Sequence, residues 1–120
     1  MVPQKVLVIE DELLIRKTTC LFLNKEKMAT VTSGTGAEGI FMAIGEKPDL
    51  ILLDLMLPDI DGWEVLRKLK ADERTRDVPV VFFSAADREV SEIEIRNRGA
   101  IGMLHKPFYP HQLFEIIKTL

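Results

Sequence analysis

The sequence of 120 residues predicts an α/β domain in which helices cover both faces of a parallel β-sheet. Apolar runs at residues 5–9, 50–53 and 78–83 show no polar alternation, which is typical of strands buried on both faces. Between these runs lie segments with the i, i+3, i+4, i+7 spacing of amphipathic helices. The length fits one domain over residues 1–120, and 47% hydrophobic residues with 29% charged residues is ordinary for a globular protein.

The first half of the chain supplies two strands and two helices. Residues 5–9 form a β-branched run, and a helix is expected over about 13–24. Apolar residues of this helix pair at i, i+7: Leu14 with Leu21, and Ile15 with Phe22. Residues 28–33 form a shorter and less apolar strand, which suits a sheet edge. The next helix ends near Gly45, and its apolar stripe consists of Ala37, Ile40, Phe41 and Ile44.

The third strand and its helix follow the same alternation. Residues 50–54 form a strand that ends on the carboxylate of Asp54. A helix is expected from about residue 62, with Trp63 packed at its start and three buried apolar residues, Val65, Leu66 and Leu69. A charged loop over 72–77 leads to the fourth strand at 78–83.

The last part of the chain supplies two helices and one strand. Asp87 is the expected N-cap of a mostly polar helix through about Arg98, whose thin apolar face consists of Val90 and Ile93. Residues 101–104 form a short strand, and residues 105–108 a loop. Pro110 suits the first turn of the last helix, which carries the stripe Leu113, Ile116, Ile117 and Leu120.

Five strands that alternate with five helices predict a doubly wound (βα)5 fold. Right-handed crossovers give a parallel five-stranded sheet with helices on both faces. The first, third and fourth strands are the most apolar, so they belong in the centre. The flavodoxin-like order 2-1-3-4-5 fits this distribution.

Three acids are expected to meet at the carboxyl edge of this sheet. In the order 2-1-3-4-5 the first and third strands are neighbours, so Glu10 and Asp11 come near Asp54. Carboxylates this close repel one another unless a cation joins them. Oxygen ligands in a partly open site suit Mg²⁺. On position alone, Asp54 could instead end the strand or begin a turn.

A hydroxyl group and an amine complete the predicted set. Ser84 ends the fourth strand, and Lys106 follows the fifth and can reach the same edge. Together with the metal, these groups suit phosphoryl transfer onto Asp54, because the ammonium and the ion stabilise charge on the phosphoryl oxygens. A lone strand-end serine or surface lysine would be structural; the combination is what points to this chemistry.

These residues resemble the receiver domain of two-component response regulators over essentially the whole chain. The resemblance rests on four segments: Val8-Ile9-Glu10-Asp11-Glu12, Asp54-Leu55-Met56-Leu57-Pro58 with Asp61-Gly62, Ser84-Ala85, and Lys106-Pro107-Phe108. It implies that Asp54 is the phosphoacceptor, bonded by Ser84 and Lys106 once phosphorylated. It also implies that Asp11 is a direct Mg²⁺ ligand, that Glu10 acts largely through water, and that Met56 lends its backbone carbonyl. The peptide bond before Pro107 is expected to be cis.

The resemblance also implies partners and an output surface. A sensor histidine kinase or a histidine phosphotransfer protein would supply the phosphoryl group, and a downstream effector domain or protein would read the face of the fourth helix, fifth strand and fifth helix. The chain would be no enzyme but would support its own phosphoryl transfer and dephosphorylation. Ile101-Gly102 stands where one DNA-binding subfamily often has an acidic pair used in dimer ion pairs, which disfavours that mode of dimerisation. A phosphorylation-dependent homodimer nevertheless stays an open alternative.

Alternative functions depend on a few positions. Met103 stands where receivers usually carry an aromatic switch residue, which leaves a non-phosphorylated pseudo-receiver that only binds proteins as the second hypothesis. Residues 34–39 match G-x-G-x-x-G but follow an edge strand, which disfavours a dinucleotide site. A flavodoxin-type phosphate site would be repelled by residues 10–12. A haloacid-dehalogenase-like phosphatase would need a second acid at Met56.

Charge and cysteine content exclude several further classes. A net charge of -3 and a pI near 5.4 give no reason to expect nucleic-acid binding by this domain, and no basic patch suggests a membrane surface. The lone Cys20 fits a reducing compartment. Residues 1–9 lack the long apolar segment of a signal peptide, so the cytoplasm is the expected location.

Overall fold

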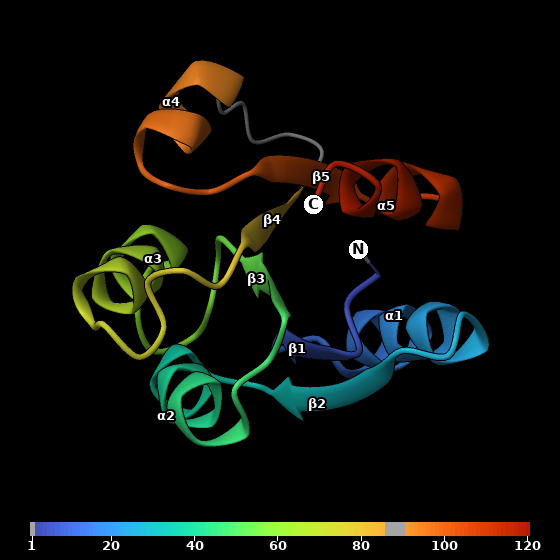
Figure 1. Ribbon diagram of the computed structural model, residues 1–120, viewed down its shortest axis with the longest axis horizontal. Coiled ribbons are helices and arrows are strands. Elements are labelled where there is room, and N and C mark those ends of the chain that lie inside the picture. Colours follow the sequence, from blue (N-terminus) through green and yellow to red (C-terminus); the bar gives the residue numbers. More distant parts are fainter. Residues whose placement is uncertain (1, 86–90) are drawn as a thin grey trace.

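The computed structural model describes residues 2–85 and 91–120, and in them five parallel strands form one sheet in the order β2-β1-β3-β4-β5. The predicted class and strand order are therefore confirmed (Figure 1). The elements along the chain are β1 (Lys5–Ile9), α1 (Leu13–Lys25), β2 (Ala29–Ser33), α2 (Gly36–Glu46), β3 (Leu50–Asp54), α3 (Gly62–Ala71), β4 (Val80–Ala85), α4 (Glu92–Asn97), β5 (Gly102–Lys106) and α5 (Pro110–Ile117).

Two hydrophobic cores lie on opposite faces of the sheet. Alternate residues of each central strand enter different cores: in β1, Leu7 packs on one face and Val8 on the other, and in β3, Ile51 and Leu52 do the same. Helices α2, α3 and α4 contribute to the first core, and α1 and α5 to the second (Figure 1). Burial on both faces explains why these strands are continuous apolar runs.

The register of the sheet brings the carboxyl ends of the strands to one edge. Ile9 of β1 pairs with Leu53 of β3, so the acids that follow Ile9 lie beside the end of β3. Strand β5 runs through Lys106, which pairs with Ala85. The expected loop over 105–108 was therefore wrong at its first two residues, because parallel pairing with β4 continues to the end of β5.

Helix α2 packs on the sheet mainly through its small residues, so the predicted stripe was wrong at Ala37 and Phe41, which are exposed, whereas Ile40 packs against the first core. Gly36, Gly39 and Ala43 are buried, whereas Phe41 is 75% exposed. A β-carbon at Gly39 would lie 2.6 Å from Ile9 Cδ1, so the helix backbone comes too close to β1 for a larger side chain. The helix also continues past Gly45 and is closed by Lys47, which has a positive φ of 49°.

The apolar faces of α1 and α4 also differ from the prediction. In α1, Leu14 and Leu21 are 73% and 65% exposed, and Leu23 is buried instead. In α4, Ile95 is buried and Ile93 is exposed. The predicted N-cap Asp87 and the apolar residue Val90 lie outside the described residues.

The remaining helices follow the prediction. Val65, Leu66 and Leu69 of α3 are buried, as are Leu113 and Ile117 of α5, which has Pro110 in its first turn. Trp63 packs edge-on against Phe82 with ring centroids 4.9 Å apart, and the Arg98 guanidinium lies 4.5 Å from the Trp63 ring centroid. Within residues 2–85 and 91–120, no helix is both long and apolar enough to cross a membrane.

Candidate functional site

Asp54 lies buried at the carboxyl end of β3, with a side chain that is 5% exposed. Its Oδ1 accepts a hydrogen bond from the Met56 backbone N–H at 2.9 Å, and its Oδ2 lies 3.0 Å from Lys106 Nζ. Neutral residues of β3 place this carboxylate in an apolar sheet, where a charge is costly unless it is paired. The ammonium and the backbone N–H group supply that pairing.

Glu10 and Asp11 converge on Asp54 from β1, as the strand order predicts. One carboxylate oxygen from each of the three acids can be chosen so that these atoms all lie within 4.8 Å of one another. Glu10 is fully buried, whereas Asp11 is exposed. The cluster therefore has two buried acids and one that opens to solvent.

Lys106 reaches the acids from β5 across the end of β4. Its Nζ lies 2.5 Å from Glu10 Oε1, in addition to its contact with Asp54. Burial alone would lower the pKa of Lys106, but the hydrogen bonds to Glu10 and Asp54 outweigh this effect and raise the pKa above its ordinary value. The amine is therefore a fixed positive charge in the site.

The acids of this cluster fit a divalent cation. Burial, and then the hydrogen bond that the protonated Glu10 carboxyl donates to Asp54, raise the pKa of Glu10 to about 8, although Lys106 offsets part of the rise. Neighbouring carboxylates of this kind need either a proton or a cation between them. An oxygen donor set that includes one exposed acid matches the preference of Mg²⁺, which binds through few carboxylates and keeps several waters.

Ser84 is buried at the carboxyl end of β4, next to the strand that carries Asp54. The register partner of Asp54 is Phe83, so Ser84 lies one residue further along the neighbouring strand. Its own partner is His105 of β5, the residue before Lys106. The structure thus brings together the ends of β1, β3, β4 and β5, which carry all five of the predicted side chains.

The loop between β3 and α3 carries Met56 and is closed by short-range contacts. An isolated antiparallel bridge joins Met56 to Asp61, and the Gly62 N–H donates to the Leu55 carbonyl at 2.9 Å. Asp61 also caps α3 by accepting a hydrogen bond from the Trp63 N–H at 2.7 Å. The Lys106–Pro107 peptide bond is cis, which confirms that expectation.

Sequence reasoning missed two features around this site. The first is Asp59, whose side chain contacts the backbone of α2. In the sequence Asp59 is only a carboxylate in a turn, and this pattern does not indicate that its hydrogen-bond partners lie at the start of α2. The second feature is the groove between α1 and the segment after β5.

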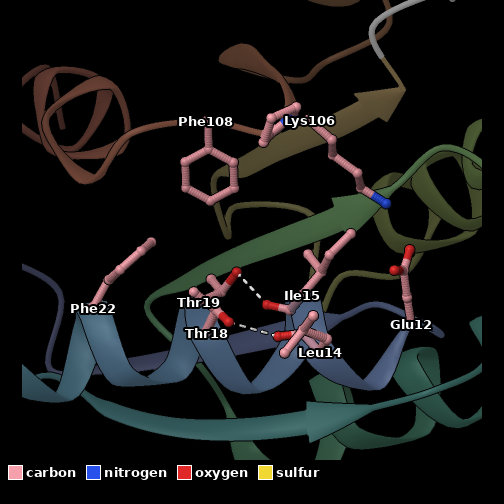
Figure 2. Close-up of a pocket in the computed structure, with 9 residues that line it drawn as sticks. Glu12, Leu14, Ile15, Thr18, Thr19, Phe22, Lys106 and Phe108 are labelled. Carbon is pink, nitrogen blue, oxygen red and sulfur yellow. Dashed lines mark hydrogen bonds between the residues drawn. The ribbon is translucent and has the colours of Figure 1, made fainter.

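This groove has a volume of about 500 Å³ and is mostly apolar. Figure 2 shows Phe22 and Phe108 at one end, and Glu12 with the amine of Lys106 at the other. Phe108 also packs against Phe83, with ring centroids 5.3 Å apart. The groove is lined by Glu12, Leu14, Ile15, Thr18, Thr19, Phe22, Lys106, Pro107 and Phe108.

Comparisons with known proteins find similar sequences over nearly the whole chain. The family model of the response regulator receiver domain matches residues 6–118. The chain is 33% identical over 120 residues to the phosphate regulon transcriptional regulatory protein PhoB of Pseudomonas aeruginosa, covering 100% of this chain and 52% of that protein. It is 33% identical over 116 residues to the transcriptional regulatory protein ResD of Bacillus subtilis, covering 97% of this chain and 47% of the relative. The chain thus spans about half the length of these curated relatives.

Solved structures of receiver domains have a similar fold. The receiver domain of the sensor histidine kinase PA1611 from Pseudomonas aeruginosa, determined with a magnesium ion coordinated in its active site cleft, matches with a TM-score of 0.85 and 26% identity, covering 97% of this chain and 95% of the other. A CheY-like receiver domain protein from Methanospirillum hungatei matches with a TM-score of 0.86 and 26% identity, covering 97% of this chain and 91% of that one.

Proposed function

Because the chain belongs to the response regulator receiver domain family, we propose that it is a phosphorylation-controlled switch whose phosphoacceptor is Asp54. The observation that carries this proposal is the position of the buried Asp54 carboxylate. It contacts the ammonium of Lys106, and together with two neighbouring acids it forms a cluster suited to a cation. The single receiver domain would extend over residues 1–120. A pseudo-receiver would have no need to keep these costly charges in a buried site.

In the proposed reaction, a carboxylate oxygen of Asp54 attacks the phosphorus of a phosphohistidine. The new P–O bond forms as the P–N bond breaks, and the imidazole leaves with the electron pair of that bond. Lys106 and Ser84 would then contact the phosphoryl oxygens. By the same contacts the chain would support its own dephosphorylation by water, although it is a switch and not an enzyme with a separate substrate.

Mg²⁺ is the cofactor that this site would hold. Asp11 and Asp54 would bind it with the backbone carbonyl of Met56, and Glu10 would act largely through water. When bound, the ion supplies positive charge that offsets the charge of the phosphoryl oxygens. The magnesium ion coordinated in the PA1611 receiver domain supports this assignment by likeness.

The phosphodonor would be a sensor histidine kinase or a histidine phosphotransfer protein. The apolar groove lies beside Lys106 and offers such a partner a contact surface (Figure 2). Leu14, which lines the groove on α1, is 73% exposed and is available for that contact. No nucleic acid and no membrane would bind this domain itself.

The output would be read at the face of α4, β5 and α5. The phosphoryl group at Asp54 would carry roughly two negative charges in place of the single charge of the carboxylate. Moving a two-state equilibrium from mostly off to mostly on requires about 5.5 kcal/mol of differential stabilisation. Helix α4 contacts β5 on this face, and Met103 of β5 packs, partly buried, against the core that contains Ile95 of α4. An effector domain or protein, or a second copy of the chain, would bind there.

The test is a mass measurement after incubation with acetyl phosphate and Mg²⁺. We expect a gain of one phosphoryl group, and we expect Asp54→Asn or removal of Mg²⁺ to abolish it. If the wild-type chain gains no mass from acetyl phosphate or from any histidine kinase, it is a pseudo-receiver. If Asp54→Asn gains the same mass as the wild type, Asp54 is not the phosphoacceptor.

A further inference from the structure

Asp59 connects the loop between β3 and α3 to the beginning of α2. Its Oδ1 accepts a hydrogen bond from the Gly36 N–H at 2.8 Å, and its Oδ2 accepts one from the Ala37 N–H at 2.9 Å. These groups belong to the first turn of α2, where N–H groups have no partner within the helix and favour a negative charge. The hydrogen bond from Ala37 above all keeps the pKa of Asp59 below its ordinary value, so the carboxylate is charged at neutral pH.

Packing reinforces this connection. A β-carbon at Gly36 would lie 2.5 Å from Ile60 Cγ1 and 2.8 Å from Val65 Cγ2. The start of α2 therefore approaches the loop and α3 as closely as a glycine permits. The loop is held against α2 by two charge-assisted hydrogen bonds and by a close apolar contact.

The same loop carries the backbone of Met56. The Met56 N–H donates to Asp54, and Met56 is bridged to Asp61 on the other side of the loop. Asp59 lies between these two bridged residues. A displacement of Asp59 would therefore move a short, closed loop, including the Met56 carbonyl.

We propose that Asp59 is a positioning residue for the metal site. By holding the loop against α2, it fixes the backbone of Met56, whose carbonyl would bind the ion together with the carboxylates of Asp11 and Asp54. This inference rests on the proposed function, because it assumes that these groups bind Mg²⁺. Since Mg²⁺ requires near-octahedral geometry at short distances, its affinity depends on how well the carbonyl is held.

The experiment compares Mg²⁺ binding to the complete chain and its variants by titration calorimetry, with the unfolding free energy of each variant measured in parallel without Mg²⁺. In Asp59→Ala both acceptors are lost, and we expect the dissociation constant to rise roughly 10-fold, the lower end of the loss that follows removal of an outer-sphere partner. Asp59→Asn keeps one acceptor oxygen and should give an intermediate affinity.

Thr35→Ala is the matched control. The Thr35 side chain accepts a hydrogen bond from the Glu38 N–H at 3.2 Å, so it caps the same helix through a bond made within α2. This variant should lose stability, as Asp59→Ala does, but should keep the wild-type affinity for Mg²⁺.

Any one of four outcomes would overturn the proposal. Wild-type affinity in Asp59→Ala would refute the positioning role while leaving the metal site intact. An equal loss of affinity in Thr35→Ala would assign the effect to general destabilisation of α2. If the wild-type chain itself fails to bind Mg²⁺, or if Asp11→Ala binds as well as wild type, the assumed site is wrong and the role of Asp59 falls with it.

Discussion

Replacing Gly62 by alanine should disturb the phosphoacceptor through the backbone. A β-carbon at this first residue of α3 would lie 2.6 Å from the Asp54 carbonyl oxygen and 2.6 Å from Leu55 Cα. Both are backbone atoms, so rotation of a side chain cannot relieve the overlap. We expect the free energy of unfolding to fall by about 1–3 kcal/mol, the usual cost of overpacking. The end of β3 must shift to make room, so phosphorylation of Asp54 should slow as well.

Gly45→Ala makes the same chemical change where there is space. No described residue (2–85 and 91–120) comes within 4 Å of a β-carbon at Gly45, and the residue is in the last turn of α2. Alanine there should raise the unfolding free energy by about 0.5–1 kcal/mol, because glycine is the more flexible residue in a helix. The two variants should therefore move stability in opposite directions.

Urea denaturation followed by far-UV circular dichroism measures both variants, and phosphorylation by acetyl phosphate is followed by mass. If Gly62→Ala is as stable as Gly45→Ala and is phosphorylated at the wild-type rate, close approach at Gly62 does not hold the end of β3 in place. A loss of phosphorylation in Gly45→Ala would equally contradict it, because that position lies away from the site.

Three further changes test individual groups of the site. Asp11→Ala should weaken Mg²⁺ binding by roughly 100-fold or more, beyond the loss typical of an outer-sphere partner; an unaltered calorimetric titration would contradict its role as a ligand. Lys106→Ala leaves the buried carboxylate of Asp54 without its ammonium partner, so the unfolding free energy should fall by about 3 kcal/mol. The phosphorylated variant should also no longer differ from the unphosphorylated variant in partner binding; unchanged stability and unchanged partner binding would argue against this role of the ammonium. Leu14→Glu should slow phosphoryl transfer from a histidine kinase but not from acetyl phosphate. Phe41→Glu, at an equally exposed position on α2, should slow neither reaction. If both variants slow transfer from the kinase equally, the groove is not the surface that the kinase contacts.

The strands and the convergence of the acids could be predicted from sequence because both depend on local patterns. Residues buried on both faces give continuous apolar runs, and parallel connections then force the ends of β1 and β3 to one edge. The cluster of Glu10, Asp11 and Asp54 follows from that order alone. The cluster can therefore be predicted without knowing how the side chains pack.

The packed faces of the helices could not be predicted in the same way. The apolar spacing of α2 predicts that Phe41 faces the core. In the structure α2 lies so close to β1 that only its glycine-containing face fits against the sheet, and Phe41 is exposed. That distance is a property of the assembled sheet. The partner of Asp59 was hidden for a related reason, since the chain separates it by more than 20 residues from the α2 backbone it contacts.

The placement of Trp63 gives the protein an intrinsic optical probe. It is the single tryptophan of the chain, so all of its indole fluorescence comes from one position. That ring touches Phe82 of β4 on one side and the Arg98 guanidinium at the end of α4 on another. Any rearrangement that separates α4 from α3 must change the surroundings of the indole, so its emission can be recorded without a label while Asp54 is phosphorylated.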